Sequence, residues 1–366
     1  MIDQVLPPAQ APVVSAAIFK AYDIRGIVET ALTEEAVSAI GLALGAKARA
    51  RGIGQVVVGR DGRLSGPALA RALSAGLCAA GVDVIDIGMV PTPLVYFATV
   101  LTGSGTGVAV TGSHNPPEYN GLKMMLGGAT LHGEDIRDIA ATLADPARYA
   151  ALFAATPGTV RTRDVVPDYI ARIAGEVKLA RPLKVVVDAG NGVAGAVAPA
   201  LLRALGITDL TELYCEVDGH FPNHHPDPAH PENLRDLMRE VKTRNADIGL
   251  AFDGDGDRLG VVTRSGQMIF PDRQLMLYAA DVLEKNPGAT IIYDVKCTRN
   301  LAPWIRARGG EPLMWCTGHS LVKAKMKETG AKLAGEMSGH IFFNDRWYGF
   351  DDGLYTAARL LEILAR

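Results

Sequence analysis

Short apolar runs rich in β-branched residues alternate with helical patterns along the whole chain. The first series holds runs at residues 55–59, 82–88 and 107–110. Their unbroken apolar character predicts strands that are buried on both faces. A helix is expected to begin near residues 65–67 and to end at Gly81. This alternation gives right-handed βαβ units on mixed, mostly parallel sheets, so the sequence predicts an α/β fold.

The alternation restarts twice, at residues 184–190 and at residues 290–295. A single helix is expected from about 193 to 205 after the first restart, and another from about 299 after the second. A chain of 366 residues is too long for one ordinary core. We therefore predict three consecutive α/β domains of similar build. The expected divisions are a flexible lead at 1–17 and domains at 18–158, 159–265 and 266–366, the last of which ends in an amphipathic helix.

The formal charge is −3, from 37 basic and 40 acidic residues, and no block of like charge occurs. This balance argues against a nucleic acid or a membrane surface as a partner. No apolar run reaches the roughly 18 residues of a membrane span. The four cysteines are irregularly spaced, which favours reduced thiols and a cytoplasmic location. A monomer is the expected state.

Residues 108–123 carry the first candidate site. An apolar strand ends at Thr111, and Gly112 is expected to turn the backbone sharply and present Ser113. A serine on a loop after a strand can act as a nucleophile or carry phosphate. His114 and Lys123 can supply positive charge or move protons beside it. The alternative is an ordinary turn with an incidental serine.

The apolar run of residues 248–252 leads into Asp253, Asp255 and Asp257, which are separated by glycines. Residues at alternate positions of an extended segment point the same way, so we expect the three carboxylates to converge. Three converging negative charges are stabilised by a divalent cation, and all-oxygen ligation suits Mg²⁺. An EF-hand does not fit, because Arg264 stands where that loop needs Glu. A solvated acidic turn is the alternative.

Two further segments suggest ligand contacts. In residues 333–343, Glu336, Ser338 and His340 alternate on a glycine-bounded loop, where a carboxylate and a hydroxyl can bind sugar hydroxyls; a structural turn is equally possible. In residues 19–28, Arg25 can hold a phosphate in bidentate geometry, although a surface pair between Asp23 and Arg25 explains it as well.

Two other segments are interpreted as structural. Residues 220–234 contain four histidines, but prolines, asparagines and aspartates break any regular ligand spacing. Residues 58–66 are glycine-containing but lack the GK[ST] ending of a P-loop, which argues against nucleotide binding.

The four chemistry-bearing segments occur in one order, as Tyr22–Gly26, Thr111–Pro116, Asp253–Arg258 and Gly335–His340. Together they resemble the α-D-phosphohexomutase family, whose members carry a YDIRG-type segment, a TGSHNP phosphoserine loop, a DGDGDR metal loop and a GEMSGH sugar loop. The resemblance extends from about residue 18 to residue 366. It is greatest to the phosphomannomutase/phosphoglucomutase branch, because phosphoglucosamine mutases usually show Gln where Met337 stands.

The resemblance implies an isomerase that interconverts the 1- and 6-phosphates of mannose or glucose in a central cleft. Phosphorylated Ser113 would give its phosphoryl group to the sugar, and the hexose 1,6-bisphosphate so formed would turn around and return the other phosphate. Mg²⁺ would be held by Ser113, Asp253, Asp255 and Asp257. Proton transfer or charge stabilisation would fall to His114, Lys123, Arg25 or His340. The substrate would be bound by Tyr22, Arg258, Lys296, His319, Glu336, Met337, Ser338, Gly339 and His340.

Members of this family have a fourth, smaller domain with an arginine- and serine-containing loop that clamps the second phosphate. The sequence as given resembles three of the four domains, so impaired catalysis is expected. Two alternatives remain open at this point. One is a metal-dependent phosphomonoester hydrolase, which would need a second metal and a histidine-containing ligand set that the sequence does not offer. The other is a sugar-phosphate-binding fragment that truncation has made inactive.

Overall fold

The computed structural model describes residues 12–366 and divides into two compact units, with the boundary between Val165 and Val166. Most of the lead expected at residues 1–17 therefore lies outside the described residues. Among the helices of the described part, none is long and apolar enough to cross a membrane.

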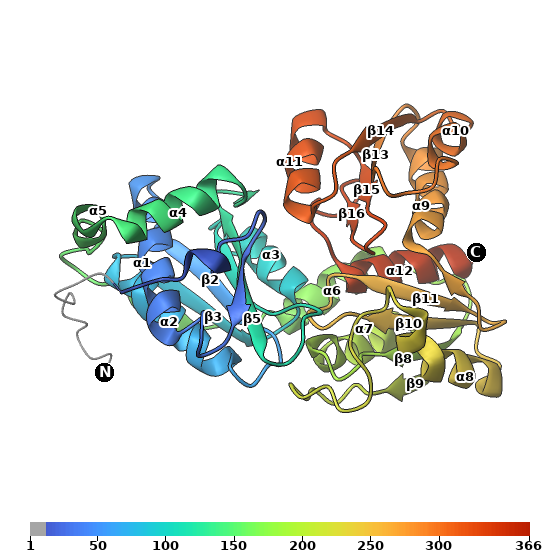
Figure 1. Cartoon of the computed structure of the whole chain (residues 1–366). Helices are drawn as coiled ribbons and strands as arrows, with labels where there is room; N and C mark the ends of the chain where they lie inside the picture. The colour runs from blue at the N-terminus through green and yellow to red at the C-terminus, as the bar shows by residue number, and fades with distance from the viewer. Residues whose placement is uncertain (1–11) are drawn as a thin grey trace. The chain divides into compact units, whose positions relative to one another are not determined.

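The N-terminal unit holds one mixed seven-stranded sheet (Figure 1). Its strand order is β1-β5-β4-β2-β3-β7, with β6 paired to β5. Strands β4, β2, β3 and β7 run parallel to one another. Strand β5 pairs antiparallel with β4 on one side and with β1 on the other. In chain order the elements are the 3₁₀ helix η1 (Ala16–Ile18), β1 (Ile24–Ile27), α1 (Glu34–Ala50), β2 (Gln55–Arg60), α2 (Gly66–Ala79), β3 (Asp83–Met89), α3 (Thr92–Leu101), β4 (Gly107–Val110), β5 (Tyr119–Leu126), β6 (Ala129–Thr130), α4 (Glu134–Ala144), α5 (Pro146–Ala150) and β7 (Val160–Thr162).

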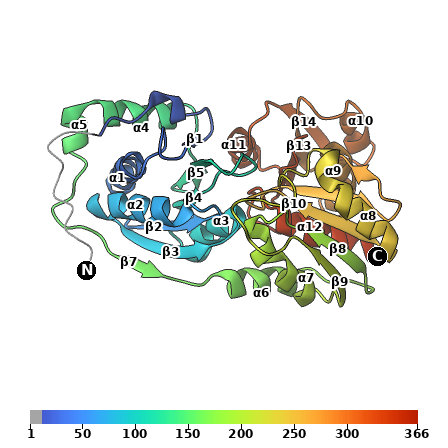
Figure 2. The same cartoon turned by 60° about the horizontal axis from the view of Figure 1, so that its bottom comes forward.

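Helices cover both faces of this sheet because its central strands are apolar on both sides. Val56 and Val58 of β2 belong to one core with α1 and α2, which lie together over the sheet in Figure 2. On the opposite face, Gly59 approaches Val95 of α3 so closely that a Cβ would lie 2.8 Å from it. Alternate residues of one strand thus point to opposite helix layers, and burial on both faces is confirmed for β2 and β4.

The prediction of a fully buried strand was wrong for β3. Asp83 and Asp86 are only half-buried, and Met89 is 38 % exposed. The neighbour of β3 on its outer side is β7, a three-residue strand that is itself exposed. The strand therefore lies near a thinly covered edge, where polar side chains remain hydrated.

The C-terminal unit contains two mixed sheets. One has the order β12-β11-β10-β8-β9 and the other the order β14-β13-β15-β16. The elements are α6 (Val166–Glu176), β8 (Lys184–Asp188), η2 (Val193–Ala196), α7 (Ala198–Ala204), β9 (Asp209–Leu213), η3 (Pro231–Leu234), α8 (Arg235–Arg244), β10 (Ile248–Phe252), β11 (Leu259–Thr263), β12 (Met268–Ile269), α9 (Pro271–Lys285), β13 (Thr290–Asp294), α10 (Leu301–Arg306), β14 (Glu311–Trp315), α11 (His319–Thr329), β15 (Leu333–Gly335), β16 (Ile341–Phe343) and α12 (Gly353–Leu364).

The single helix expected at 193–205 is in fact two pieces, η2 and α7. Pro199 stands in the first turn of α7. Proline has no N–H, and its ring clashes with the carbonyl four residues earlier, so one continuous helix cannot pass through this position.

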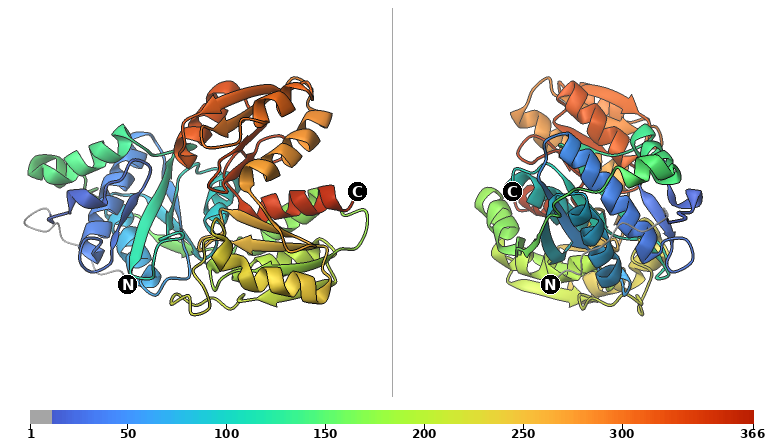
Figure 3. Two further views of the ribbon diagram at one scale, coloured as in Figure 1. Left: turned by 45° about the vertical axis from the view of Figure 1, so that its right-hand side comes forward. Right: turned by 90° about the vertical axis from the view of Figure 1, so that its left-hand side faces the viewer.

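The last helix, α12, is amphipathic as expected, but its polar face is buried as well as its apolar face. It packs against β10 and β11 of one sheet and against β16 of the other, and it lies between the two sheets in Figure 3. Its charged residues form ion pairs with neighbouring segments. Arg359, 1 % exposed, donates to Asp281 at 2.9 Å and to Asp345 at 2.8 Å.

The α/β class with mixed sheets is thus confirmed for both units. Each sheet pairs its central strands in parallel and adds antiparallel strands at one edge.

Candidate active-site loops

The three sheets each carry a chemistry-bearing loop at the same point of their topology. The loop joins the last parallel strand to the first antiparallel strand, from β4 to β5, from β10 to β11 and from β15 to β16. The strand pairs nearest these loops are Val110 with Leu122, Phe252 with Leu259 and Gly335 with Ile341. Ligands bind beyond the carboxyl ends of parallel strands. Each loop therefore stands at the ligand-binding edge of its own sheet.

Ser113 follows β4 in a tightly held conformation. It is 1 % exposed, and its φ of +51° lies in the left-handed region, which costs a non-glycine residue free energy. Its backbone N–H donates to Thr111 Oγ1 at 2.8 Å. Its Oγ lies 3.2 Å from His114 Nδ1, within reach of proton exchange.

The sharp turn was expected at Gly112, but the left-handed residue is Ser113. Gly112 has a different function. A Cβ at this position would lie 2.4 Å from Cζ of Arg63 and 2.8 Å from the carbonyl oxygen of Tyr119. Glycine is therefore required here because the Arg63 guanidinium passes directly against the backbone.

Arg25, on β1, contacts this same loop. It pairs with Asp23 at 2.5 Å, so the ion pair considered as an alternative does form. Both side chains are largely buried, however, and Arg25 also donates to Asn115 Oδ1. This second contact attaches β1 to the Ser113 loop.

The two other candidates of the N-terminal unit differ in exposure. Lys123 is 3 % exposed on β5, in register with Ala109 of β4. Tyr22 lies before β1 and is 37 % exposed. Only Lys123 therefore belongs to the buried framework of this sheet.

Asp253, Asp255 and Asp257 follow β10 and are completely buried. Their carboxylate oxygens can all lie within 4.8 Å of one another, so the expected convergence is confirmed. The expected reason was wrong. The segment is a turn, closed by a hydrogen bond of 3.1 Å from Gly256 N to Asp253 O, and Gly256 has a φ of +76°. The turn, and not an extended strand, gathers the carboxylates.

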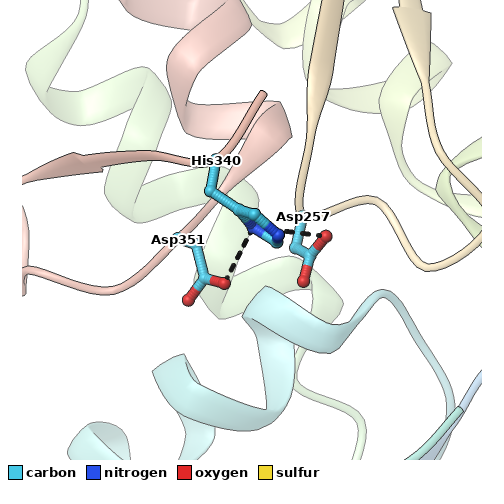
Figure 4. Close-up of side chains that lie close together, drawn as sticks. All are labelled: Asp257, His340 and Asp351. Atoms are coloured by element: carbon cyan, nitrogen blue, oxygen red, sulfur yellow. Dashed lines mark ion pairs between the residues drawn. The ribbon is translucent and has the colours of Figure 1, made fainter. Parts of the chain in front are cut away.

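A second group, shown in Figure 4, joins this loop to the loop after β15. His340 Nδ1 lies 3.1 Å from Asp351 Oδ2 and 3.7 Å from Asp257 Oδ1. All three residues are buried, and their ligand atoms lie within 4.8 Å. The sequence did not reveal this histidine-containing set, because Asp351 follows β16 and belongs to no recognised motif.

Cations balance much of this negative charge. Arg258 Nε donates to His340 Nε2 at 3.1 Å and lies 3.8 Å from Asp253 Oδ2. Burial alone would lower the pKa of Arg258, but the surrounding aspartates raise it. Burial would raise the pKa of Asp351, yet Lys323, 2.8 Å away, and the neighbouring imidazoles hold it well below its ordinary value. The group is therefore a paired charge network.

The loop of residues 336–340 is a tight turn, in which Glu336 N donates to His340 O at 2.9 Å. Glu336 is 1 % exposed, and its Oε1 accepts from Gly318 N at 2.5 Å. Burial raises the pKa of Glu336. The hydroxyl of Ser338 is buried and has no hydrogen-bond partner among residues 12–366. Gly339 adopts a φ of +103°, which glycine tolerates best.

Asp294, at the end of β13, connects three segments at this edge, and the sequence analysis did not single it out. Its carboxylate accepts from Thr317 Oγ1 at 2.8 Å, from Met337 N at 3.3 Å and from Cys297 Sγ at 3.1 Å. Asp294 thereby fixes the backbone of Met337, one of the predicted substrate residues, in the loop after β15. No local motif marks such a role.

The remaining two candidates lie at the same edge of this sheet. His319 begins α11, is 8 % exposed and stacks on His340 with ring centroids 5.5 Å apart. Lys296 follows β13 and is exposed. His319 thus belongs to the buried network, whereas Lys296 faces solvent.

The histidine-rich segment at 220–234 makes structural contacts. His224 Nε2 lies 3.1 Å from both carboxylate oxygens of Asp188, at the end of β8. Burial lowers the pKa of His224, but the Asp188 carboxylate outweighs this and raises it. The pair fastens the long loop to its sheet.

Three domain models of one family match this chain. They are phosphoglucomutase/phosphomannomutase alpha/beta/alpha domain I at residues 16–149, domain II at 167–266 and domain III at 270–366. A phosphomannomutase/phosphoglucomutase of Pseudomonas aeruginosa is 56 % identical over 358 residues, which cover 98 % of this chain and 76 % of that protein. A phosphoglucomutase of Neisseria gonorrhoeae is 58 % identical over 348 residues, covering 95 % and 75 %.

Solved structures agree. A phosphoglucomutase/phosphomannomutase family protein from Burkholderia thailandensis superposes with a TM-score of 0.92 at 60 % identity, over 97 % of this chain and 78 % of that one. A protein of Thermus thermophilus, described as a phosphomannomutase, gives 0.86 at 26 % identity, over 97 % and 80 %.

Fold and loops define the class as an isomerase that acts as an intramolecular phosphotransferase. The chain belongs to the phosphoglucomutase/phosphomannomutase family, the α-D-phosphohexomutases. The family predicted from the four motifs is thus confirmed, and it replaces the hydrolase alternative.

Proposed function

We propose that this chain interconverts hexose 1-phosphates and hexose 6-phosphates of mannose, glucose or both. The reaction proceeds through phosphorylated Ser113 and a hexose 1,6-bisphosphate, which also serves as the activator. Relatives more than half identical to this chain are named for these sugars. The observation that carries the proposal is Ser113 itself, buried at the end of β4 in a strained conformation with His114 Nδ1 3.2 Å from its Oγ.

Strain at this serine supports a covalent role, because backbone strain persists only where surrounding contacts enforce it. Phosphoryl transfer from Ser113 breaks its O–P bond and forms a new one to a sugar hydroxyl, which loses a proton. His114 is within reach of Ser113 Oγ to hold or move a proton. Arg25, Lys123 and His340 are further candidates for charge stabilisation or proton transfer.

The carboxylates after β10 fit a divalent cation. They offer only oxygen ligands, are fully buried and can bring three oxygens within 4.8 Å, which is the donor set that Mg²⁺ prefers. We propose that Asp253, Asp255 and Asp257 hold Mg²⁺, which when bound neutralises charge on the transferring phosphoryl group. A fourth ligand from Ser113 stays a prediction of the family resemblance, because Ser113 belongs to the other unit.

Sugar recognition is assigned to the loop after β15. Glu336 has one oxygen occupied by Gly318 N, and a carboxylate has further acceptor sites for sugar hydroxyls. The unpartnered hydroxyl of Ser338 can donate or accept. Met337, Gly339, Arg258, His319, Lys296 and Tyr22 are proposed to complete the substrate site.

Ser113→Ala tests the proposal. It should lower mutase activity by at least ~10³, the scale expected when a covalent step is lost. Ser104→Ala is the matched control, because Ser104 lies in the same unit in the loop before β4, where its hydroxyl bonds to Thr102 and Thr106. The rate should also depend on added glucose 1,6-bisphosphate. Retention of a tenth of the activity in Ser113→Ala would exclude the phosphoserine route.

A cytoplasmic location and a monomeric state are part of the proposal. All four cysteines are free, which fits a reducing compartment. Light scattering of the purified chain tests the monomer.

A further inference from the structure

The loop that carries Ser113 lies on a buried ion pair fifty residues earlier in the chain. Asp61 and Arg63 follow β2 and are 2 % and 1 % exposed. Arg63 Nε lies 3.2 Å from Asp61 Oδ2. Two opposite charges buried this deeply are costly unless hydrogen bonds satisfy them. Here six of those bonds go to residues 111–119.

Asp61 binds the donors at the start of the loop. Its Oδ2 accepts from Thr111 Oγ1 at 2.8 Å and from Gly112 N at 3.1 Å. Its Oδ1 accepts from Arg63 N at 3.0 Å. Thr111 Oγ1 in turn accepts from Ser113 N, so the position of the Ser113 amide depends on Asp61 through one intermediate hydroxyl.

Arg63 binds the acceptors in the rest of the loop. Its Nη2 donates to the carbonyl of Ser113 at 2.8 Å and to that of Asn115 at 2.6 Å. Its Nη1 donates to the carbonyls of Pro116 at 2.6 Å and Tyr119 at 2.9 Å. One planar guanidinium therefore orients four peptide groups around the nucleophile.

The fit between this guanidinium and the loop is close. The Cβ that alanine would add at Gly112 would overlap Arg63 Nε at 2.4 Å. Lysine cannot replace the guanidinium, because an ammonium has three donors from one point and no fork geometry. The carbonyl contact at Ser113 also opposes relaxation of its left-handed φ of +51°.

We propose that Asp61 and Arg63 are positioning residues for phosphoryl transfer at Ser113. They orient the peptide groups on both sides of the serine and thereby fix where Oγ points. The inference rests on the proposed phosphoserine function. A displacement of about 1 Å in a reacting group can cost on the order of 10²-fold in rate, so a loosened loop should affect transfer far more than substrate affinity.

Arg63→Lys and Asp61→Asn test this proposal in the full 366-residue chain. The rate at which glucose 1,6-bisphosphate phosphorylates Ser113 should fall ~10²-fold in each, measured by intact mass against time. The bisphosphate concentration giving half-maximal rate should change less than ~3-fold. Arg49→Lys is the matched control, because Arg49 lies in the same unit and also donates to backbone carbonyls, those of Ala80 and Leu152. Its phosphorylation rate should equal that of wild type.

Circular dichroism at the assay temperature shows whether each variant is folded. If Arg63→Lys is unfolded, the test rests on Asp61→Asn, in which the new side chain has nearly the same shape as the old one. A folded variant that is phosphorylated at the wild-type rate overturns the inference. An equal fall in rate for Arg49→Lys overturns it too, because a general loss of stability would then explain the slower phosphorylation. Phosphate incorporation into Ser113→Ala at the wild-type rate would instead overturn the proposed function.

Discussion

Replacing Asp255 by Asn should raise the thermal stability of the metal-free protein. It should also reduce the stability that the protein gains when Mg²⁺ is added. The three carboxylates after β10 are fully buried, with oxygens within 4.8 Å of one another. At an effective dielectric constant of about 20, two unit charges at that distance repel by about 3.5 kcal/mol. Asp255 takes part in two such pairs, which gives a gross repulsion of about 7 kcal/mol.

The net effect is smaller than this sum. Arg258 lies 3.8 Å from Asp253 and 3.9 Å from Asp257 and offsets part of the charge. Relaxation of the side chains and penetration of water absorb more. Without metal we expect the free energy of unfolding to rise by a net amount of about 1–3 kcal/mol. For a unit of this size, each kcal/mol raises the unfolding midpoint by about 2–4 °C.

The assay is thermal unfolding followed by circular dichroism, once in EDTA and once in Mg²⁺. Wild type should gain about 2.7 kcal/mol at a Mg²⁺ concentration 100 times the dissociation constant, whereas Asp255→Asn should gain much less. Asp272→Asn is the matched control, because Asp272 is a buried aspartate of the same unit that accepts from Thr298 N outside the triplet. A lower midpoint for Asp255→Asn in EDTA, together with a full response to Mg²⁺, would refute the reasoning.

Three further predictions concern particular residues, and a fourth concerns the length of the chain. Gly112→Ala should destabilise the N-terminal unit by about 1–3 kcal/mol, because its Cβ would lie 2.4 Å from Arg63 Cζ; urea unfolding checks this. Burial raises the pKa of Asp352 to about 7, so the folded protein keeps this proton while the unfolded chain loses it. Relative to Asp352→Asn, the wild-type free energy of unfolding should therefore fall by about 2–4 kcal/mol as pH rises from about 4 to about 7, then stay level; a flat difference would contradict the burial. Glu336→Gln should weaken the binding of 1-phosphate and 6-phosphate substrates alike, by about 1–3 kcal/mol, and steady-state kinetics checks this. A version of residues 1–366 joined to the portion of the Pseudomonas aeruginosa relative outside the matched 76 % should turn over hexose phosphates about 10²–10⁴ times faster than residues 1–366 alone, and rates within tenfold would show that portion to be dispensable.

The sequence predicts the strands and the local motifs well because both depend on neighbouring residues. The apolar run at residues 107–110 becomes β4, buried on both faces. The glycine-spaced aspartates after β10 converge, although through a turn at Gly256 that periodicity alone does not reveal. The burial of α12 was not predicted, because its neighbours are two sheets formed by earlier segments.

The supporting residues of the site escaped sequence analysis for the same physical reason. Asp61 and Arg63 lie in a segment whose glycines suggest a nucleotide loop and nothing more, and their partners begin fifty residues later. Asp294 and Asp351 belong to no motif, and each gains its role when separate segments meet at one sheet edge. A carboxylate or guanidinium that serves backbone groups leaves no periodic signature in a single sequence.

Covalent phosphorylation of Ser113 is the central claim, and mass spectrometry tests it most directly. The chain is incubated with glucose 1,6-bisphosphate and Mg²⁺, its intact mass is measured, and the modified peptide is sequenced. The account predicts the added mass of one phosphoryl group, located on Ser113 and absent from Ser113→Ala. Phosphate on another residue, or an unchanged mass after complete exposure to the bisphosphate, would contradict it.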